Sequence, residues 1–196
     1  GVGKNLHDHV RANLQFTCAE PVTMHQLMRI DRIASAMLQA ILFRSGPGAS
    51  FPAEAGGFTK IMDNDPTPDA QWYCFIGTST NRVRLTDWGE PDDNRNQQFA
   101  IGTVLLRPRS LGEIGLRSGN PYDAPLVFPN LLACDEDVDK LVVLAKRATL
   151  LSQQASFKGL LGTNLSGTDK IDSESGWRKW VRENVVTSAH PVGTCK

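Results

Sequence analysis

Residues 10–18 read Val-Arg-Ala-Asn-Leu-Gln-Phe-Thr-Cys, and apolar and polar side chains alternate along this stretch. Alternation is typical of a strand that buries one face and leaves the other open, because successive side chains point to opposite sides. We therefore expect a half-buried strand here. Glu20-Pro21 follows and ends it, since proline cannot donate to a strand ladder.

Three further segments predict strands. Residues 71–77 are nearly continuous in apolar side chains, which is typical of a central strand. Residues 99–106 predict another strand. The sequence then turns at 107–112 and returns with period two at 113–118, so we expect these two strands to form a hairpin. Residues 126–128 predict a short strand.

A long helix is expected to follow the first strand. Thr23 and Gln26 have the spacing of a capping box, and Ser45 with the Gly-Pro-Gly after it stops the helix. Apolar residues recur between these ends at steps of three and four, so we expect them to form a buried stripe. The stripe comprises Met24, Leu27, Met28, Ala34, Met37, Leu38, Ile41 and Leu42.

Two more helices are expected in the C-terminal half. One begins at Asp135, and its acidic first turn suits the positive end of a helix dipole. A shorter helix opens at Ser173 and places Trp177, Trp180 and Val181 on one side. The stripe expected to be buried in the longer helix comprises Val138, Leu141, Val142, Ala145, Ala148 and Leu151.

The remaining long segments, 46–58, 78–98 and 158–171, are expected to be irregular by their composition. Strands and helices do not alternate in βαβ fashion, and no internal repeat or linker is visible. The expected fold class is therefore α+β, an antiparallel sheet with helices packed against it. Residues 1–196 are expected to form a single domain, since this length suffices for one sizeable core.

Charge and length exclude several classes of function. Lys+Arg and Asp+Glu both number 21 in the 196 residues, so the net charge is zero. A neutral chain has no electrostatic footprint for nucleic acid or an anionic membrane surface. The apolar runs are also too short to span a bilayer. The four cysteines are far apart in sequence, which favours free thiols and a cytoplasmic location.

The first nine residues invite two interpretations that we reject. Gly1-x-Gly3 begins like a dinucleotide-binding loop, but Leu6 stands where the third glycine belongs. His7 and His9 share one face of an extended chain, yet two ligands without a matched acidic or cysteine partner are too few for a metal. We therefore expect neither a phosphate loop nor a metal site.

Both ends of the chain lead to the same expectation. The chain starts at Gly1 with no initiator methionine, and it stops at Lys196 directly after a Gly-Thr-Cys sequence. We expect the sequence to be the middle of a larger protein. The last nine residues, 188–196, contain His190, which is the strongest catalytic candidate in the chain.

Four blocks together resemble a known family. Residues 1–9 are similar to a GVGxNLxDH segment, and residues 46–58 end in Glu-Ala-Gly-Gly-Phe, as that family's second block does. Residues 106–130 resemble its LRPxSRGxxxLxSxxP run, and residues 190–196 match HPxGTCK. In this order and spacing, the blocks resemble the glucose–methanol–choline (GMC) family of flavin-dependent alcohol oxidoreductases, and most closely its choline dehydrogenase branch. Leu111 departs from the family pattern, where arginine is usual, as Leu131 does where tyrosine is common.

The resemblance implies a flavin enzyme of which this chain is one part. The whole protein would bind FAD through a Rossmann-type segment that this chain lacks, so residues 1–196 would be mainly the substrate domain and inactive alone. His190 would accept the hydroxyl proton of a small, primary, choline-like alcohol while FAD takes the hydride. Asn5 would lie near the flavin. Aromatic faces and a carboxylate suit a quaternary ammonium, and the available residues of these types are Trp72, Tyr73, Phe75 and Glu54.

A second hypothesis belongs to a different class. The chain would be a stand-alone binding or interaction domain that keeps the fold without any flavin. In either case the faces meant to pack on other segments would be bare apolar patches, and we expect the isolated chain to dimerise through them.

Overall fold

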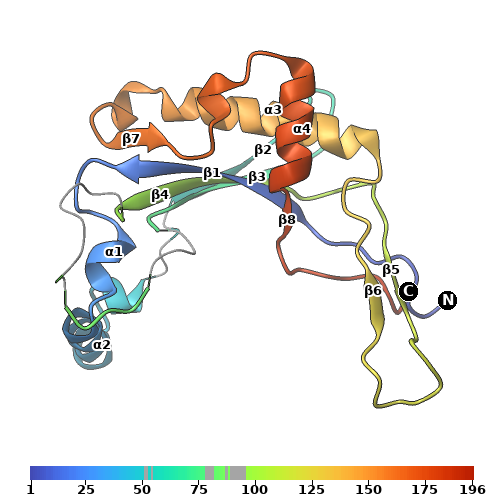
Figure 1. Cartoon of the computed structure of the whole chain (residues 1–196), viewed down its shortest axis with the longest axis horizontal. Coiled ribbons are helices and arrows are strands. Elements are labelled where there is room, and N and C mark those ends of the chain that lie inside the picture. The colour runs from blue at the N-terminus through green and yellow to red at the C-terminus, as the bar shows by residue number, and fades with distance from the viewer. Residues whose placement is uncertain (51–52, 54, 78–81, 87, 89–95) are drawn as a thin grey trace.

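The computed structural model describes residues 1–50, 53, 55–77, 82–86, 88 and 96–196. The described part of the chain has the overall shape of an arch (Figure 1). A mixed α+β fold with an antiparallel sheet is confirmed. Glu54 and most of the acidic loop 87–94 lie outside the described residues.

The sheet of the described chain has six strands in the order β2-β3-β4-β1-β7, with β8 also paired to β1. All of these pairings are antiparallel. Their bounds are β1 Val10–Cys18, β2 Ala55–Thr59, β3 Ala70–Phe75, β4 Gln98–Leu105, β7 Leu161–Asn164 and β8 Val186–Thr187. The first strand is as expected, because every second side chain of β1 is buried.

Two helices cover one face of this sheet. Figure 1 shows α3 (Asp135–Ser152) and α4 (Glu174–Asn184) above the strands. The buried stripe expected in α3 is confirmed except for Leu151, which is 37% exposed. In α4, Ser173 caps the first turn by accepting from the Gly176 amide, and its two tryptophans are buried. The core therefore lies between these helices and the upper face of the sheet.

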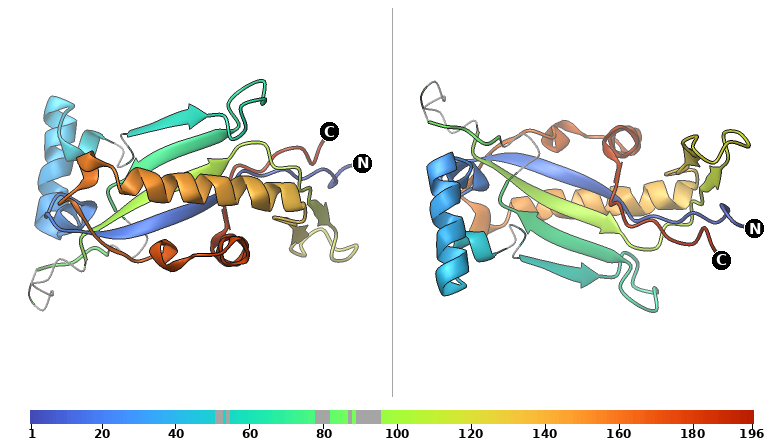
Figure 2. Two further views of the ribbon diagram at one scale, coloured as in Figure 1. Left: turned by 90° about the horizontal axis from the view of Figure 1, so that it is seen from above. Right: turned by 90° about the horizontal axis from the view of Figure 1, so that it is seen from below.

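The opposite face carries no described helix along its strands. Viewed from below in Figure 2, the strands are visible between α2 at one end and the chain termini at the other. Register places Arg11 and Asn13 of β1 opposite Val104 and Gly102 of β4, and the same β4 residues lie opposite Gln71 and Tyr73 of β3. We call this surface the open face. Its side chains include Arg11, Asn13, Gln15, Gln71, Tyr73 and Phe75.

The helix expected after β1 is interrupted and exposed. It consists of α1 (Met24–Leu27) and α2 (Ile30–Phe43), with a break at the Arg29 N-cap, which has extended backbone angles. No residue of α2 is buried, and Met37, Ile41 and Leu42 are 56%, 72% and 62% exposed. The prediction of a buried stripe was wrong, because amphipathic spacing shows that a helix has an apolar face but not which surface covers it. Dimerisation through such a face stays a prediction.

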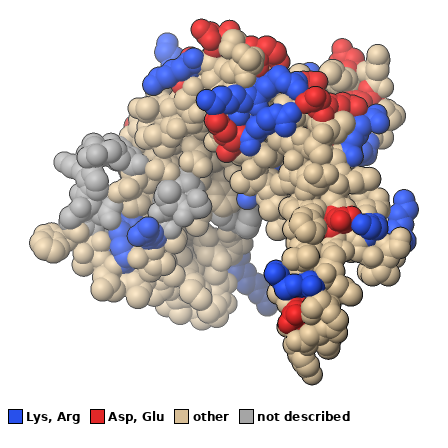
Figure 3. All heavy atoms as spheres, turned by 45° about the vertical axis from the view of Figure 1, so that its right-hand side comes forward, with Lys and Arg blue, Asp and Glu red and all other residues tan. Residues whose placement is uncertain are grey.

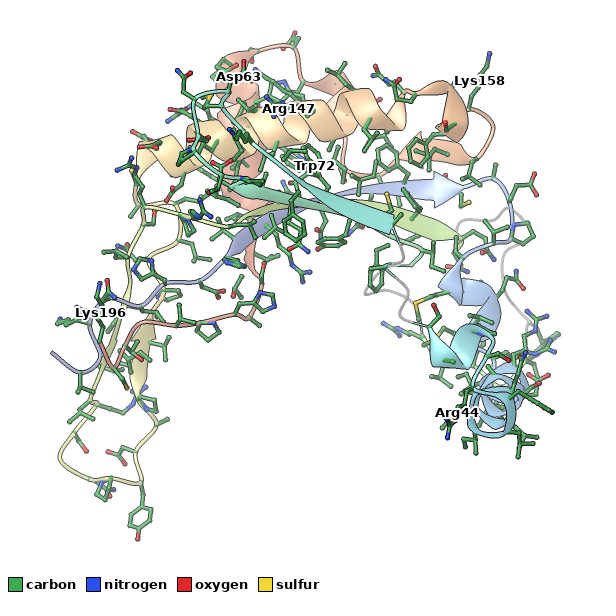
Figure 4. All side chains as sticks on the ribbon, turned by 180° about the vertical axis from the view of Figure 1, so that it is seen from behind. Arg44, Asp63, Trp72, Arg147, Lys158 and Lys196 are labelled. Atoms are coloured by element: carbon green, nitrogen blue, oxygen red, sulfur yellow. The ribbon has the colours of Figure 1, made fainter. Side chains whose placement is uncertain are left out.

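The expected hairpin at residues 99–118 was also wrong. The short strand β5 (Glu113–Gly115) pairs with β6 (Leu126–Phe128) rather than with β4. Together they form an arm next to both termini, and Figure 4 shows Lys196 on this side and Arg44, after α2, at the far end of the arch. Residues 107–112 do not reverse onto β4 because Asp137 of α3 binds the Arg109 and Ser110 amides. Segments expected to be irregular contain β2 and β7.

Short single-turn helices complete the described elements. They are the 3-10 helices η1 (Pro47–Ala49), η2 (Ala155–Phe157) and η3 (Thr168–Lys170). Charged side chains gather over the helical layer at the top of Figure 3, whereas much of the lower part in that view is uncharged.

A buried ion pair fixes β3 to α3 and makes stability depend on pH. Asp69 accepts from the Ile61 amide at 2.8 Å and from Lys140 Nζ at 2.9 Å. Burial acts to raise the pKa of Asp69, but the hydrogen bonds from Lys140 and Ile61 and the lysine charge outweigh it, so the pKa lies below its usual value. A lowered folded-state pKa stabilises the protein above the unfolded pKa, and this contribution is lost as the pH falls.

We expect the free energy of unfolding to decline as the pH drops below about 4. In an Asp69→Asn variant this decline should be shallower, because the titrating group is gone. Urea unfolding at several pH values between about 2 and 6 measures it. Parallel pH profiles for the two proteins would show that Asp69 contributes nothing to the pH dependence.

Candidate active site

The two ends of the chain lie side by side as an antiparallel pair. His7 and Val192 exchange both backbone hydrogen bonds at 2.9 Å, the Gly3 amide donates to the Thr194 carbonyl at 2.8 Å, and the Ser188 amide donates to the His9 carbonyl at 2.9 Å. We call residues 3–9 and 188–194 the terminal ribbon. It brings the first and last sequence blocks together, although they are more than 180 residues apart.

His190 is held in this ribbon by Asp8. One oxygen of the Asp8 carboxylate accepts from the His190 amide at 3.0 Å, and the other accepts from the Thr187 hydroxyl. Ala189 has a positive φ of 58°, which turns the chain before His190. The backbone of the catalytic candidate is therefore fixed, while its side chain stays exposed.

The ring of His190 lies against the ring of His9. Their Nδ1 atoms are 3.4 Å apart, and the ring centroids are 5.4 Å apart in an edge-on arrangement. Burial lowers the pKa of His9 below its usual value, and nearby His190 lowers it further, against the opposing effect of Asp8. His9 is therefore neutral near pH 7, so it does not repel a proton taken up by His190.

Asn5 has a structural role in the ribbon. Its Oδ1 lies 3.0 Å from His7 Nε2, and its Nδ2 donates to the Gly193 carbonyl at 3.4 Å. Asn5 itself has a positive φ of 64°, which asparagine tolerates better than most residues. The side-chain amide is thus occupied within the chain, and the expected contact between Asn5 and a flavin stays a prediction.

Gly193 allows the two strands of the ribbon to approach closely. Its φ is +95°, and a Cβ at this position would lie 2.3 Å from the Asn5 carbonyl oxygen. In a Gly193→Ala variant of the whole protein we expect turnover to fall about 10- to 100-fold, because the segment that carries His190 must shift. Steady-state kinetics measure the effect.

Gly159→Ala is the matched control. Gly159 also has a positive φ, of +84°, but nothing lies within 4 Å of a Cβ placed there. Any cost of the backbone conformation alone is therefore shared by both variants, and only the Gly193 variant should lose turnover. Equal turnover in the two variants would contradict a positioning role for Gly193.

A cavity of about 500 Å³ opens between the sheet and the ribbon. Tyr73 and Phe75, which the sequence analysis named for their aromatic faces, line it from the open face. Trp72 also borders the cavity, but its side chain lies on the opposite face of β3 and packs against the core. Tyr73 lies flat against β4, since a Cβ on Gly102 would meet its ring at 2.2 Å. The other described lining residues are Arg11, Ala53, Ala55, Gly56, Gly57, Phe58, Gln71, Val104, Ser188 and His190.

His190 also borders a second hollow of about 440 Å³ on the other side of the ribbon. His190 is the one described residue that lines both hollows. The second is lined by His7, Asp8, His9, Leu106, Arg107, Pro108, His190 and Val192. The imidazole therefore stands between two spaces, each large enough for a small molecule or part of a cofactor.

Four residues of this site escaped the sequence analysis. His9 was considered with His7 as a rejected metal pair, and Asp8 was given no role beyond its place in the first sequence block. Ser188 was treated only as the start of the last block. Arg11 was seen as one polar position of a strand. A charged residue in a strand with a buried opposite face indicates a side chain that leaves the core face, and this was the available signal for Arg11.

Two kinds of feature are absent from the described part of the chain. No three His, Cys, Asp or Glu side chains there are grouped to hold a metal ion. No described helix combines the length and apolar character needed to cross a membrane.

Known proteins resemble this chain in sequence and in fold. Residues 108–196, which include His190, match the family described as GMC oxidoreductase. Within the chain, residues 108–196 correspond to a GMC oxidoreductase domain. All 196 residues also align with mitochondrial choline dehydrogenase of Mus musculus at 29% identity, covering 32% of that protein. The chain thus spans about a third of the length of the curated relatives it matches.

Solved structures share the fold of the GMC domain. A formate oxidase from Aspergillus oryzae matches with a TM-score of 0.78 at 22% identity, over 98% of this chain and 37% of the oxidase. A pyridoxine 4-oxidase matches with a TM-score of 0.71 at 16% identity, over 100% of this chain and 33% of that one. GMC proteins bind FAD and act on CH–OH donors. This chain corresponds to their substrate domain.

Proposed function

We propose that the whole protein oxidises a primary alcohol to an aldehyde, with FAD as the hydride acceptor and His190 as the acceptor of the hydroxyl proton. The observation that carries this proposal is the position of His190. Its exposed ring stands at the border of the open-face cavity, on a backbone that Asp8 and the ribbon hold in place.

The ring nitrogens of His190 have different surroundings. Nδ1 faces His9, and in the described chain Nε2 has no hydrogen-bond partner. Nε2 is therefore the atom that would take the proton from the alcohol, and the neutral His9 ring supports the charge that forms. A fixed base in contact with the hydroxyl group lowers the cost of bringing the reacting groups together.

The residues around His190 fit a flavin. Apolar and aromatic side chains line much of the described part of the open-face cavity, which suits a flat, largely apolar ring system. Val192, which is 63% exposed, offers an apolar surface beside His190. Val192 and the ribbon backbone would lie against the bound group. When bound, FAD supplies the acceptor for the two electrons and the hydrogen that leave the alcohol carbon.

Turnover of the whole protein with a dye as electron acceptor tests the proposal. We would assay a panel of primary alcohols that includes choline, and identify the aldehyde product. Aldehyde formation from at least one member supports the proposal. A flavin-loaded protein that oxidises none of them contradicts it. A native protein without flavin would favour the stand-alone binding domain.

Choline is the substrate expected from the sequence, and the names of the curated relatives support it. Tyr73 and Phe75 provide aromatic faces in the cavity, as a quaternary ammonium requires. Arg11 in the same cavity carries a positive charge and opposes it. We therefore propose a primary alcohol and treat choline as one member of the panel.

We expect the 196-residue chain alone to be inactive, because relatives of this kind are about three times longer. Dye-coupled turnover of the isolated chain in the presence of added FAD measures this. Aldehyde formation at a rate within about tenfold of the whole protein would contradict it. We also propose a cytoplasmic location, which the four free cysteines support, and cell fractionation tests it.

A further inference from the structure

Among the described residues that line the open-face cavity, Arg11 is the one arginine or lysine. It projects from β1, where Nη1 donates to the Tyr73 hydroxyl at 2.9 Å. Tyr73 in turn donates to Asn13 Oδ1 at 3.1 Å. The guanidinium is thus oriented by a short chain of hydrogen bonds on the open face, without a carboxylate partner among the described residues.

Two side-chain atoms of the described chain are buried without any hydrogen-bond partner, and both belong to this cavity. They are Nε of Arg11 and Oγ of Ser188. An unmet buried donor costs about 1–3 kcal/mol, so native proteins seldom leave one without a reason. Their occurrence in one cavity points to a ligand atom that accepts from both.

The two groups come from neighbouring strands. Arg11 lies opposite Val186 of β8, and the Ser188 amide two residues later binds the His9 carbonyl. Residues two apart on a strand project to the same side, so Ser188 leaves its strand on the side of Val186. His190 follows two positions further and borders the same cavity. Two unmet donors and the proton acceptor are therefore grouped at one end of the cavity.

We propose that the alcohol carries a carboxylate, and that Arg11 and Ser188 bind it while the hydroxyl group reaches His190. Arginine suits a carboxylate because its planar fork matches the two oxygens. The Tyr73 hydrogen bond occupies Nη1 and leaves Nε for the ligand. This specificity rests on the proposed alcohol oxidation.

The reaction balances without a further reagent. Bound FAD would accept the carbinol hydrogen with the two electrons of the broken C–H bond, and His190 would take the hydroxyl proton. The carboxylate stays unchanged, and the product is an aldehyde acid. Choline is disfavoured, because its ammonium would be placed beside the like charge of Arg11.

The test compares three primary alcohols in the flavin-loaded whole protein: 4-hydroxybutanoate, 1-butanol and choline. We expect kcat/KM for 4-hydroxybutanoate to exceed that for 1-butanol by about 30-fold, with choline lowest. In Arg11→Gln the ratio of kcat/KM for the hydroxy acid to kcat/KM for butanol should fall by about 10- to 30-fold, which removes most or all of the preference. Equal preference in the variant and the wild type would overturn the proposal.

Two further variants distinguish the loss of the carboxylate contact from a general loss of folding or activity. Arg11→Lys keeps the charge but not the fork, and we expect it to retain part of the preference. Arg109→Gln is the matched control, since Arg109 is 69% exposed, pairs with Glu136 and lines no cavity described above. Its kinetics should equal those of the wild type.

A binding measurement separates this inference from the proposed function. Butanoate has the carboxylate but no hydroxyl group, so its affinity can be titrated calorimetrically in the whole protein whether or not any alcohol reacts. We expect Arg11→Gln to weaken butanoate binding about 30-fold. If butanoate binds in this way and no alcohol reacts, the anion site stands and the proposed reaction fails. If butanoate affinity is unchanged by the substitution, the anion site is refuted.

Discussion

Replacing His190 with alanine in the whole protein should lower kcat for the alcohol about 100- to 10,000-fold, the range expected for loss of a positioned proton acceptor. The reason is local: Nδ1 of His190 faces His9, and Nε2 is left for the hydroxyl group. The His190 side chain is exposed, so its removal creates no buried cavity. Single-turnover reduction of the flavin measures the chemical step directly.

Cys195→Ser is the control for this variant. Cys195 is exposed and belongs to the same sequence block, but it lines neither hollow beside His190. We expect wild-type kinetics from it. A His190→Ala protein that keeps its flavin and its thermal midpoint, and that also keeps more than about a tenth of wild-type kcat, would remove His190 from the mechanism.

The largest expected effect on stability comes from Asp137. This carboxylate is 1% exposed in the first turn of α3, and it accepts from the Arg109 amide, the Ser110 amide and the Ser110 hydroxyl at 2.8, 2.8 and 2.5 Å. In Asp137→Ala these donors lose their acceptor inside the protein. We expect the free energy of unfolding to fall by about 3–5 kcal/mol, since several charge-assisted hydrogen bonds break at once.

Urea unfolding of the whole protein, followed by tryptophan fluorescence, measures this change, because Trp177 and Trp180 are buried in α4, which packs on α3. Asp139→Ala is the control on the same helix. Asp139 is 54% exposed and pairs with Arg178, so its loss should cost less than about 1 kcal/mol. Similar effects of both substitutions would show that the Asp137 contacts do not hold the segment after β4.

Local patterns predicted the parts of the fold that depend on local contacts. The alternation of residues 10–18 foretold the buried face of β1, and the acidic first turn at Asp135 foretold the start of α3. A short helix was expected to open at Ser173, and in the structure Ser173 caps α4 by accepting from the Gly176 amide. In each case the deciding contact joins residues a few positions apart, or the pattern reflects burial of a whole face.

The predictions that were wrong concern contacts between residues that are far apart in the sequence. Nothing near residues 107–118 indicates that α3 will bind this segment and that β5 will pair with β6. The apolar residues of α2 have the spacing of a core helix, yet the described chain does not cover them. The spacing of apolar residues indicates the period of a helix, but it does not indicate which surface covers the apolar face.

The candidate site, like the fold, was predicted from local sequence only in part. His190 was identified from its sequence block, and its role as proton acceptor stays a prediction until the variant is measured. The pairing of the two chain ends, the contact with Asp8 and the arrangement of Arg11 with Ser188 depend on the sheet, which brings residues 3–9 beside residues 188–194. No local pattern reports such an arrangement.

The most direct test of a flavin-linked alcohol site beside His190 is the absorption spectrum of the whole protein without oxygen, before and after a primary alcohol is added. We predict an oxidised flavin spectrum that bleaches in the wild type within the turnover time and bleaches about 100-fold or more slowly in His190→Ala. A flavin that no alcohol of the panel bleaches, or that bleaches equally fast in both proteins, would contradict the account.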